Sequence, residues 1–215
     1  MTSDLPSGVL TFLFTDIEGS TRRWDIDARA MQTALAAHDA VLKDAIEALD
    51  GVVFKHSGDG VCAVFSSPRN AVDAAVTAQR SLELPVRMGI ATGEAELRDG
   101  DYFGAVLNRA ARVMSAGNGG QILLDGTTAG LLSDVDLVPM GPRHLRGIAK
   151  PVDISQLRAE GLRAEFPPLN TLDSTPGNLR PPVTSFIGRR AELADVETAI
   201  KAHRDRQPVR RNRTD

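Results

Sequence analysis

The sequence has 215 residues, of which 42% are hydrophobic, and its net charge is -3. A chain of this length can bury one substantial core, and it favours one domain with an appendage over two complete domains. The weakly acidic balance excludes a broad electrostatic attraction to nucleic acid or to an anionic membrane, so any phosphate binding must come from local groups.

The first half of the chain predicts a strand, a helix and a hairpin. Residues 9–15 (VLTFLFT) form an apolar run typical of a buried strand. Apolar residues recur at helical spacing over residues 27–49, and Gly51 stands where a C-terminal cap is expected. Residues 52–55 and 61–65 are short strand patterns joined by the turn HSGDG.

The following segment predicts two more helices and two more strands. The helices are expected at residues 68–84 and 103–114, and the strands at residues 86–92 and 121–124. The resulting order is βαββαβ followed by αβ additions. We therefore expect an α+β fold with a ferredoxin-like βαββαβ core, in which antiparallel strands pack under helices.

The composition changes near the end of this pattern. We place a first domain at residues 1–160 and a proline-rich linker at residues 161–188. Residues 189–215 then carry a short helical pattern, at 189–202, and a polar tail that we expect to be disordered.

The single cysteine and the N-terminus indicate the compartment. Cys62 has no partner for an intrachain disulfide, and its alternating apolar neighbours predict a buried strand position rather than a reactive thiol. The first residues, MTSDLPSG, lack the regions of a secretion leader, and no apolar run approaches the roughly 18 residues of a membrane span. We expect a soluble, cytoplasmic protein.

Two carboxylates stand where the predicted strands end. Asp16 closes the first strand and Asp59 lies in the hairpin turn, and in this plan the two can lie side by side. Paired carboxylates suit Mg²⁺ or Mn²⁺ bound together with the phosphates of a nucleotide. The segment 17–21 (IEGST) could cradle phosphate oxygens with its backbone N–H groups. The alternative is two ordinary turn aspartates, with Ser20 and Thr21 as helix caps.

Four segments, taken in order and spacing, resemble the motif set of class III nucleotide cyclases. They are FLFTDIEGST, KHSGDG, DYFGAVLNRAAR and LRGIAKPVDI, and the resemblance covers roughly residues 8–158. It implies an adenylate cyclase, which converts ATP to cyclic AMP and pyrophosphate with two divalent metal ions, Mg²⁺ or Mn²⁺. Such a site is shared between the two subunits of a homodimer, so a lone monomer would be inactive.

The resemblance also implies a role for each motif residue. The metal ions would be held by Asp16, Ile17 and Asp59. Lys55 and Asp101 would read the purine, Asn108 would orient the ribose, and Arg112 would stabilise the transition state. The spacing i and i+4 of the last two supports a shared helix face independently, although each could instead be a solvated surface residue.

The phosphates would be bound by two segments. The first supplies Glu18, Gly19, Ser20 and Thr21. In the second, Arg146 stands where many relatives carry a lysine for the terminal phosphates, and Lys150 is a possible substitute. The histidines His38, His56 and His144 receive no role.

Other functions remain open at this point. A catalytically degenerate cyclase-like domain could bind a nucleotide and act as a regulatory module. A ferredoxin-like nucleic-acid binder is less suited to a chain with 4% aromatic residues and no basic face. The tail resembles the linker and the opening of an ATPase module in bacterial cyclase-containing transcriptional regulators, but no GxxxxGK[ST] phosphate loop occurs.

Overall fold

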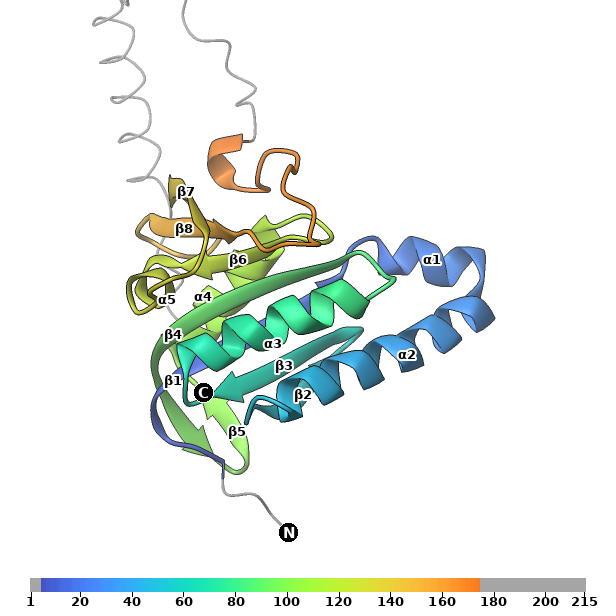
Figure 1. Ribbon diagram of the computed structural model, residues 1–215, viewed down its shortest axis with the longest axis horizontal. Helices are drawn as coiled ribbons and strands as arrows, with labels where there is room; N and C mark the ends of the chain where they lie inside the picture. Colours follow the sequence, from blue (N-terminus) through green and yellow to red (C-terminus); the bar gives the residue numbers. More distant parts are fainter. Residues whose placement is uncertain (1–4, 175–215) are drawn as a thin grey trace, which may run out of the picture. The chain divides into compact units, whose positions relative to one another are not determined.

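The computed structural model describes residues 5–174, which form a mixed sheet with helices on both faces (Figure 1). The strands are β1 Gly8–Ile17, β2 Val52–Ser57, β3 Gly60–Phe65, β4 Val86–Arg98, β5 Asp101–Phe103, β6 Ile122–Asp125, β7 Leu137–Arg143 and β8 Val152–Leu157. The helices are α1 Ser20–Ile26, α2 Ala28–Glu47, α3 Pro68–Ser81, α4 Ala105–Ala116, α5 Gly126–Gly130 and the 3-10 turn η1 Leu172–Ser174.

The sheet order confirms the expected α+β class. The strands run β2-β3-β1-β4-β6-β8-β7, and β5 pairs with β4. The first four are antiparallel neighbours, which is the arrangement of a ferredoxin-like βαββαβ core. β6 then joins β4 in parallel, and the antiparallel pair β8 and β7 extends the sheet beyond it.

The alternation of side chains along β1 divides the interior into two clusters. Leu13 and Ile17 point to one face, where they pack with buried residues of α2 and α3. Leu10 and Phe12 point to the opposite face, where they pack with Tyr102 and with the buried side of α4. Figure 1 shows α2 and α3 side by side over the near face, with α4 on the far side of the sheet.

Several elements differ from the expected pattern. A helix from residue 103 is wrong, because Asp101–Phe103 pairs with the long strand β4 as β5, and α4 begins only at Ala105. The helix expected at residues 27–49 is present as α2, but a short helix that the pattern did not predict, α1, precedes it. Asp27 adopts an extended conformation that ends α1, and its side chain caps α2 by accepting a hydrogen bond from Ala30 N at 2.9 Å.

The predictions for the C-terminal part can be compared with the structure only up to residue 174. The helical pattern at residues 189–202 and the tail to 215 lie outside the described residues. In contrast, the described part of the expected linker packs on the domain, with Leu169 only 4% exposed. The boundary at residue 160 stays a prediction. Among residues 5–174, no helix combines the length and apolarity needed to cross a bilayer.

The thiol of Cys62 is expected to be inert in the folded protein. Burial in β3 raises its pKa to about 11, and Asp101 adds to this while nearby Lys55 opposes it. At pH 8 the residue is therefore a neutral thiol. Compared with the urea-unfolded chain, we expect iodoacetamide to alkylate the native protein roughly a hundredfold more slowly, as read by mass spectrometry. Equal rates in both states would contradict the buried position.

Candidate functional site

Asp16 and Asp59 come together because the β2–β3 turn lies against the end of β1. Val61 N donates a hydrogen bond of 2.9 Å to Thr15 Oγ1, which ties the start of β3 to the residue before Asp16. A Cβ on Gly60 would lie 2.2 Å from the carbonyl oxygen of Thr15, so only glycine permits this approach. The two aspartates that the sequence paired therefore stand at one end of adjacent strands.

The two carboxylates differ in what they contact. Asp59 Oδ2 is buried and has no hydrogen-bond partner among the described residues. Asp16 is about a quarter exposed, and its Oδ2 accepts hydrogen bonds from Arg87 Nε at 2.8 Å and from Nη2 at 2.5 Å. A buried carboxylate oxygen without a partner is costly unless a cation binds it. This pair of hard oxygen donors therefore fits a divalent ion.

A metal bound here would need further ligands. Among residues 5–174, no group of three or more His, Cys, Asp or Glu side chains is placed to hold an ion. Mg²⁺ and Mn²⁺ commonly complete their coordination with water and with the oxygens of a phosphate. The geometry thus fits an ion that arrives with a phosphorylated ligand better than an ion held by protein alone.

Arg87 belongs to this site, and sequence reasoning missed it. It pairs directly with Asp16 in the register of β1 and β4, so both side chains leave the same face of the sheet. In the sequence, Arg87 is a single charged residue near the start of an apolar strand. Such a residue by itself indicates only the exposed end of a strand. Asp16 in β1 was visible in the sequence as a possible partner of opposite charge. Only the register of β1 and β4 shows that Arg87 lies opposite it.

Lys55 and Asp101 are in direct contact, although they are 46 residues apart in the chain. The hydrogen bond with Asp101 raises the pKa of Lys55, and the same bond lowers the pKa of Asp101, so both remain charged at neutral pH. The side chains are 52% and 30% exposed, which leaves donors and acceptors open to a ligand.

A β-bulge in β2 determines the face of the sheet on which Lys55 lies. Val53 pairs with Ala63 and Lys55 pairs with Cys62, so two residues of β2 advance against one of β3. The ring of Phe54 packs edge-on against Phe12 and Tyr102. The bulge turns Lys55 to the face of the sheet from which Asp16 also projects, whereas regular alternation would turn it to the α2 and α3 face.

Asn108 and Arg112 lie one turn apart on α4, as the spacing predicted. Asn108 is exposed, while Arg112 Nε is buried with no hydrogen-bond partner in the described chain. Arg112 Nη2 lies 3.9 Å from the place that a Cβ on Gly147 would occupy. The catalytic candidate on α4 therefore lies beside the β7–β8 loop, which carries Arg146.

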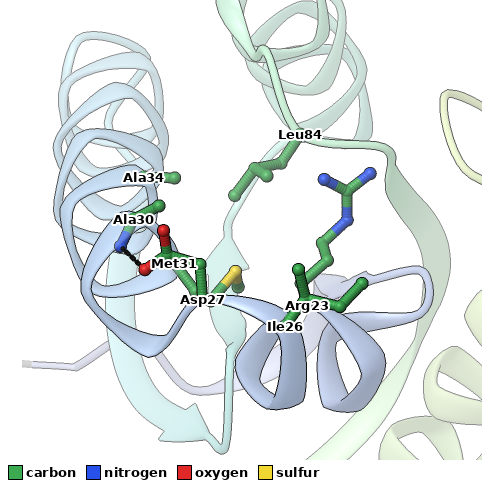
Figure 2. A pocket seen from close by; sticks show the side chains of 7 residues that line it. All are labelled: Arg23, Ile26, Asp27, Ala30, Met31, Ala34 and Leu84. Atoms are coloured by element: carbon green, nitrogen blue, oxygen red, sulfur yellow. Dashed lines mark hydrogen bonds between the residues drawn. The ribbon is translucent and has the colours of Figure 1, made fainter.

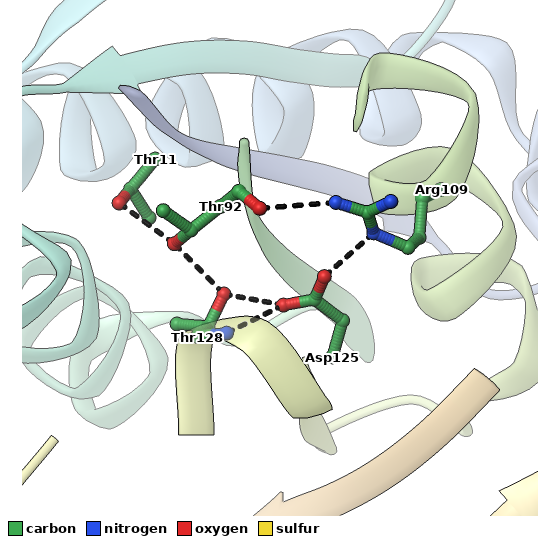
Figure 3. A network of polar contacts seen from close by, with 5 residues as sticks. All are labelled: Thr11, Thr92, Arg109, Asp125 and Thr128. Atoms are coloured by element: carbon green, nitrogen blue, oxygen red, sulfur yellow. Dashed lines mark hydrogen bonds and ion pairs between the residues drawn. The ribbon is translucent and has the colours of Figure 1, made fainter. Parts of the chain in front are cut away.

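A buried polar network holds α4 against the sheet (Figure 3). Arg109 Nε donates to Asp125 Oδ2 at 2.6 Å, and its Nη2 donates to Thr92 O at 3.0 Å. Asp125 accepts from the N–H and hydroxyl of Thr128, whose hydroxyl also bonds to that of Thr92. Arg109 follows Asn108 directly on α4, so its hydrogen bonds to the sheet restrict the rotation of the helix. The network therefore fixes the direction of the face that carries Asn108 and Arg112.

The segment 17–21 makes the turn into α1. The side chain of Ile17 is 1% exposed and packs in the core, so only its backbone can contribute to a metal or phosphate site. Gly19 precedes α1 with a φ of 69°, and no side chain in the described chain caps the helix. Glu18 and Thr21 are exposed and Ser20 is half-buried. Glu18 N donates to the carbonyl of Pro85 at 2.9 Å, so the backbone N–H groups left for an anion are those at the start of α1.

The other phosphate candidates separate in the structure. Arg146 and Lys150 are both exposed on the β7–β8 loop. Lys150 lines a hollow of about 480 Å³ together with Arg109 and Asp125, whereas Arg146 directly precedes Gly147, the loop residue that adjoins the guanidinium of Arg112. The geometry favours Arg146 over Lys150 as a partner of Arg112.

A separate apolar groove lies between α1 and α2 (Figure 2). It has a volume of about 260 Å³, and Arg23 and Leu84 face Met31 and Ala34 across it. None of the candidate site residues lines this groove. It is therefore not a continuation of the carboxylate site.

Known proteins resemble the chain in sequence and in structure, although no protein-family model matches it. It is 37% identical over 199 residues to an uncharacterized protein of Mycobacterium tuberculosis, covering 88% of this chain and 70% of that protein. It is 30% identical over 207 residues to a receptor-type adenylate cyclase of Trypanosoma brucei brucei, covering 70% of this chain and 36% of that protein.

Two solved structures share the fold. Monomeric adenylate cyclases from Trypanosoma brucei superpose with a TM-score of 0.70 at 27% identity, covering 78% of this chain and 95% of the other. The adenylyl cyclase CyaB from P. aeruginosa gives a TM-score of 0.63 at 25% identity, covering 71% of this chain and 94% of the other.

Proposed function

Because this chain belongs to the class III nucleotidyl cyclase family, we propose that it is an adenylate cyclase that converts ATP to 3′,5′-cyclic AMP and pyrophosphate. The observation that carries the proposal is the buried, unpartnered oxygen of Asp59, in a turn that is tied to the end of the strand carrying Asp16. In this reaction the ribose 3′-hydroxyl attacks the α-phosphorus and pyrophosphate leaves.

The carboxylates supply the cation site of the proposed reaction. Asp16, Asp59 and the backbone of Ile17 would hold two divalent ions, Mg²⁺ or Mn²⁺. The ions, when bound, lower the pKa of the attacking hydroxyl and neutralise charge on the phosphates. Arg87, which donates to one oxygen of Asp16, would also be placed to donate to a phosphate oxygen of a bound nucleotide.

The remaining residues position ATP and stabilise developing charge. Asn108 orients the ribose, and Arg112 donates hydrogen bonds to the α-phosphoryl oxygens as the phosphorus is attacked. The buried Nε of Arg112 without a partner supports this role, since a guanidinium with an unused donor is suited to an anion. The turn 18–21 and Arg146 bind the β- and γ-phosphates, with Lys150 as the less favoured cation.

The active unit is proposed to be a homodimer with two composite sites. One subunit contributes Asp16 and Asp59, and its partner contributes the purine-reading pair together with Asn108 and Arg112. Because a two-fold interface uses the same surface twice, both sites are equivalent. ATP is the partner ligand, and neither a nucleic acid nor a membrane is required.

Base selectivity tests the Lys55 and Asp101 pair. Adenine offers an acceptor at N1 and a donor at its 6-amino group, which suit an ammonium and a carboxylate, while guanine reverses both. Guanine would leave both contacts mispaired, so we expect ATP to be preferred over GTP by roughly ten- to a hundredfold per contact. Lys55→Glu combined with Asp101→Cys should erode the preference, as measured by kcat/KM for both nucleotides.

A double variant that keeps the wild-type ratio of ATP to GTP use would contradict this assignment. The matched control is Lys43→Glu, because Lys43 forms an exposed ion pair on α2 with Glu47. Its ratio should stay unchanged. Equal use of ATP and GTP by the unmutated protein would remove the base-reading role but leave cyclase activity possible.

The proposal as a whole is tested by a cyclase assay. Purified protein should form cyclic AMP from ATP in the presence of Mg²⁺ or Mn²⁺, with GTP and metal-free buffer as the comparison arms. If ATP binds and no cyclic nucleotide forms, the chain is instead a degenerate nucleotide-binding regulatory module. Arg146, in place of the lysine of many relatives, is the residue that favours this second possibility.

A further inference from the structure

The chain after β8 forms an arm, residues 161–174, that packs on the domain (orange in Figure 1). Gln156 Nε2 donates to the carbonyl of Ala164 at 2.7 Å near the start of the arm. Leu169 is 4% exposed and belongs to the same buried cluster as Leu145, Val113 and Ala116. A proline-rich segment that buries a leucine in the core is part of the fold rather than a spacer.

The arm is tied to the end of α4. Asn170 N donates to the carbonyl of Ala116 at 2.8 Å, and Asn118 Nδ2 donates to the carbonyl of Pro167 at 3.1 Å. Ala116 is the last residue of α4, the helix that carries Asn108 and Arg112. The arm therefore contacts α4, which carries Arg112. The other candidate phosphate-binding arginine, Arg146, is on the β7–β8 loop.

The arm is also tied to the β7–β8 loop. His144 N donates to Asp173 Oδ2 at 2.8 Å, and His144 Nδ1 bonds to Asp173 Oδ1 at 2.7 Å, where the ring nitrogen donates because a carboxylate only accepts. Leu172 N donates to the carbonyl of His144 at 3.1 Å. The carboxylate of Asp173 thus accepts hydrogen bonds from both the backbone and the ring of His144. The sequence pattern assigned no role to this histidine.

This contact lies two residues from Arg146. Leu145 is 2% exposed and anchors the loop in the same cluster as Leu169. The next residues carry the exposed Arg146 and then Gly147, which adjoins the Arg112 guanidinium. The loop is therefore fixed by Asp173 and Leu169, and its exposed Arg146 directly precedes the glycine that adjoins Arg112.

We propose that Asp173 is a positioning residue, which holds the β7–β8 loop so that Arg146 reaches the terminal phosphates of the nucleotide. This inference rests on the proposed function and adds a residue beyond the cyclase motifs. An exposed ion pair alone contributes little, and Asp173 is 35% exposed. The positioning comes from the two-point grip on His144 and from the burial of Leu169 next to Leu145.

The charge state of Asp173 suits this role. The hydrogen bonds from the backbone and ring of His144 hold the pKa of Asp173 below its usual value, and Arg143 acts in the same direction. The carboxylate is therefore ionised throughout the neutral range. Protonation would weaken the grip only at acid pH, below the ordinary pKa of an aspartate.

The test measures nucleotide binding by the full chain. Isothermal titration with ATP and with AMP separates the contribution of the terminal phosphates, because AMP lacks the groups that Arg146 would contact. Asp173→Ala should weaken ATP binding by roughly three- to tenfold, about the loss of one or two hydrogen bonds, and leave AMP binding unchanged. The control is Asp136→Ala, which removes an exposed carboxylate paired with Arg158 and should change neither.

A double-mutant cycle distinguishes positioning from general stability. Once Arg146→Ala has removed the cation, the further change Asp173→Ala should cost nothing more in ATP affinity. Full additivity, or an equal loss for ATP and AMP, would overturn the proposal. His144→Ala, which keeps the backbone donor, should give a smaller loss than Asp173→Ala.

The outcome also separates this inference from the cyclase proposal. ATP binding without cyclic AMP formation would refute the proposed activity and leave the role of Asp173 measurable. ATP binding that Asp173→Ala does not alter would refute the positioning role alone. A chain that binds no ATP would refute both.

Discussion

Replacing Asp59 by asparagine should abolish cyclic AMP formation, with a loss of about a thousandfold or more in kcat. The change keeps the size of the side chain and removes the charge that holds a cation, and a cation at a phosphoryl centre contributes several kcal/mol to the transition state. Since Asp59 Oδ2 has no hydrogen-bond partner among the described residues, the stability of the fold should not fall.

The matched control for Asp59→Asn is Asp73→Asn. Asp73 is an exposed carboxylate on α3 that pairs with Arg69 one turn away. This variant should retain full activity, and urea unfolding should give both variants a free energy of unfolding close to that of the wild type. Wild-type turnover in Asp59→Asn would rule out the proposed metal site.

Mixing two inactive variants should restore activity if the sites are composite. In a heterodimer of an Asp16→Ala chain and an Arg112→Ala chain, one site contains neither substitution. Random exchange makes half of the dimers heterodimers with one intact site of two, so roughly a quarter of the wild-type activity is expected. The measurement is cyclic AMP formation as a function of the mixing ratio, which should peak at equal amounts.

A second pair of variants controls this experiment. Asp16→Ala and Asp59→Ala affect the same half of each composite site, so every site in their heterodimer carries one defect. No recovery is expected from that mixture. If the first mixture also stays inactive while crosslinking shows that heterodimers form, each site is built within one chain.

The regular elements of the core could be predicted because their patterns depend on local spacing. The buried strand that contains Asp16, the amphipathic helix before Gly51 and the helix that begins at Pro68 are all present in the structure. Each has an apolar period or a cap that needs no knowledge of distant residues. Lys55 and Asp101, which the motifs grouped, are in contact, and the turn with Asp59 is tied to the end of β1, while the roles of these residues stay predictions.

The missed features depend on contacts that local spacing does not encode. β7 contains Pro139, Gly141 and Pro142, which read as breakers and are tolerated because the strand lies at the edge of the sheet. The arm has the composition of a linker, and its folding rests on Leu169 entering a distant cluster. Arg87 joins the site only through the register of two strands far apart in sequence.

The ion pair between Asp16 and Arg87 has a thermodynamic consequence for the order of events. Arg87 donates two hydrogen bonds to Asp16 Oδ2, so a divalent ion that used this oxygen would weaken the ion pair, and its affinity for the protein without nucleotide is expected to be low. A triphosphate that accepts Arg87 removes this penalty. Metal and nucleotide are therefore expected to bind cooperatively, and each must strengthen the other by the same factor. The protein at rest would discriminate against free Mg²⁺ and respond to the metal–nucleotide complex as a single ligand.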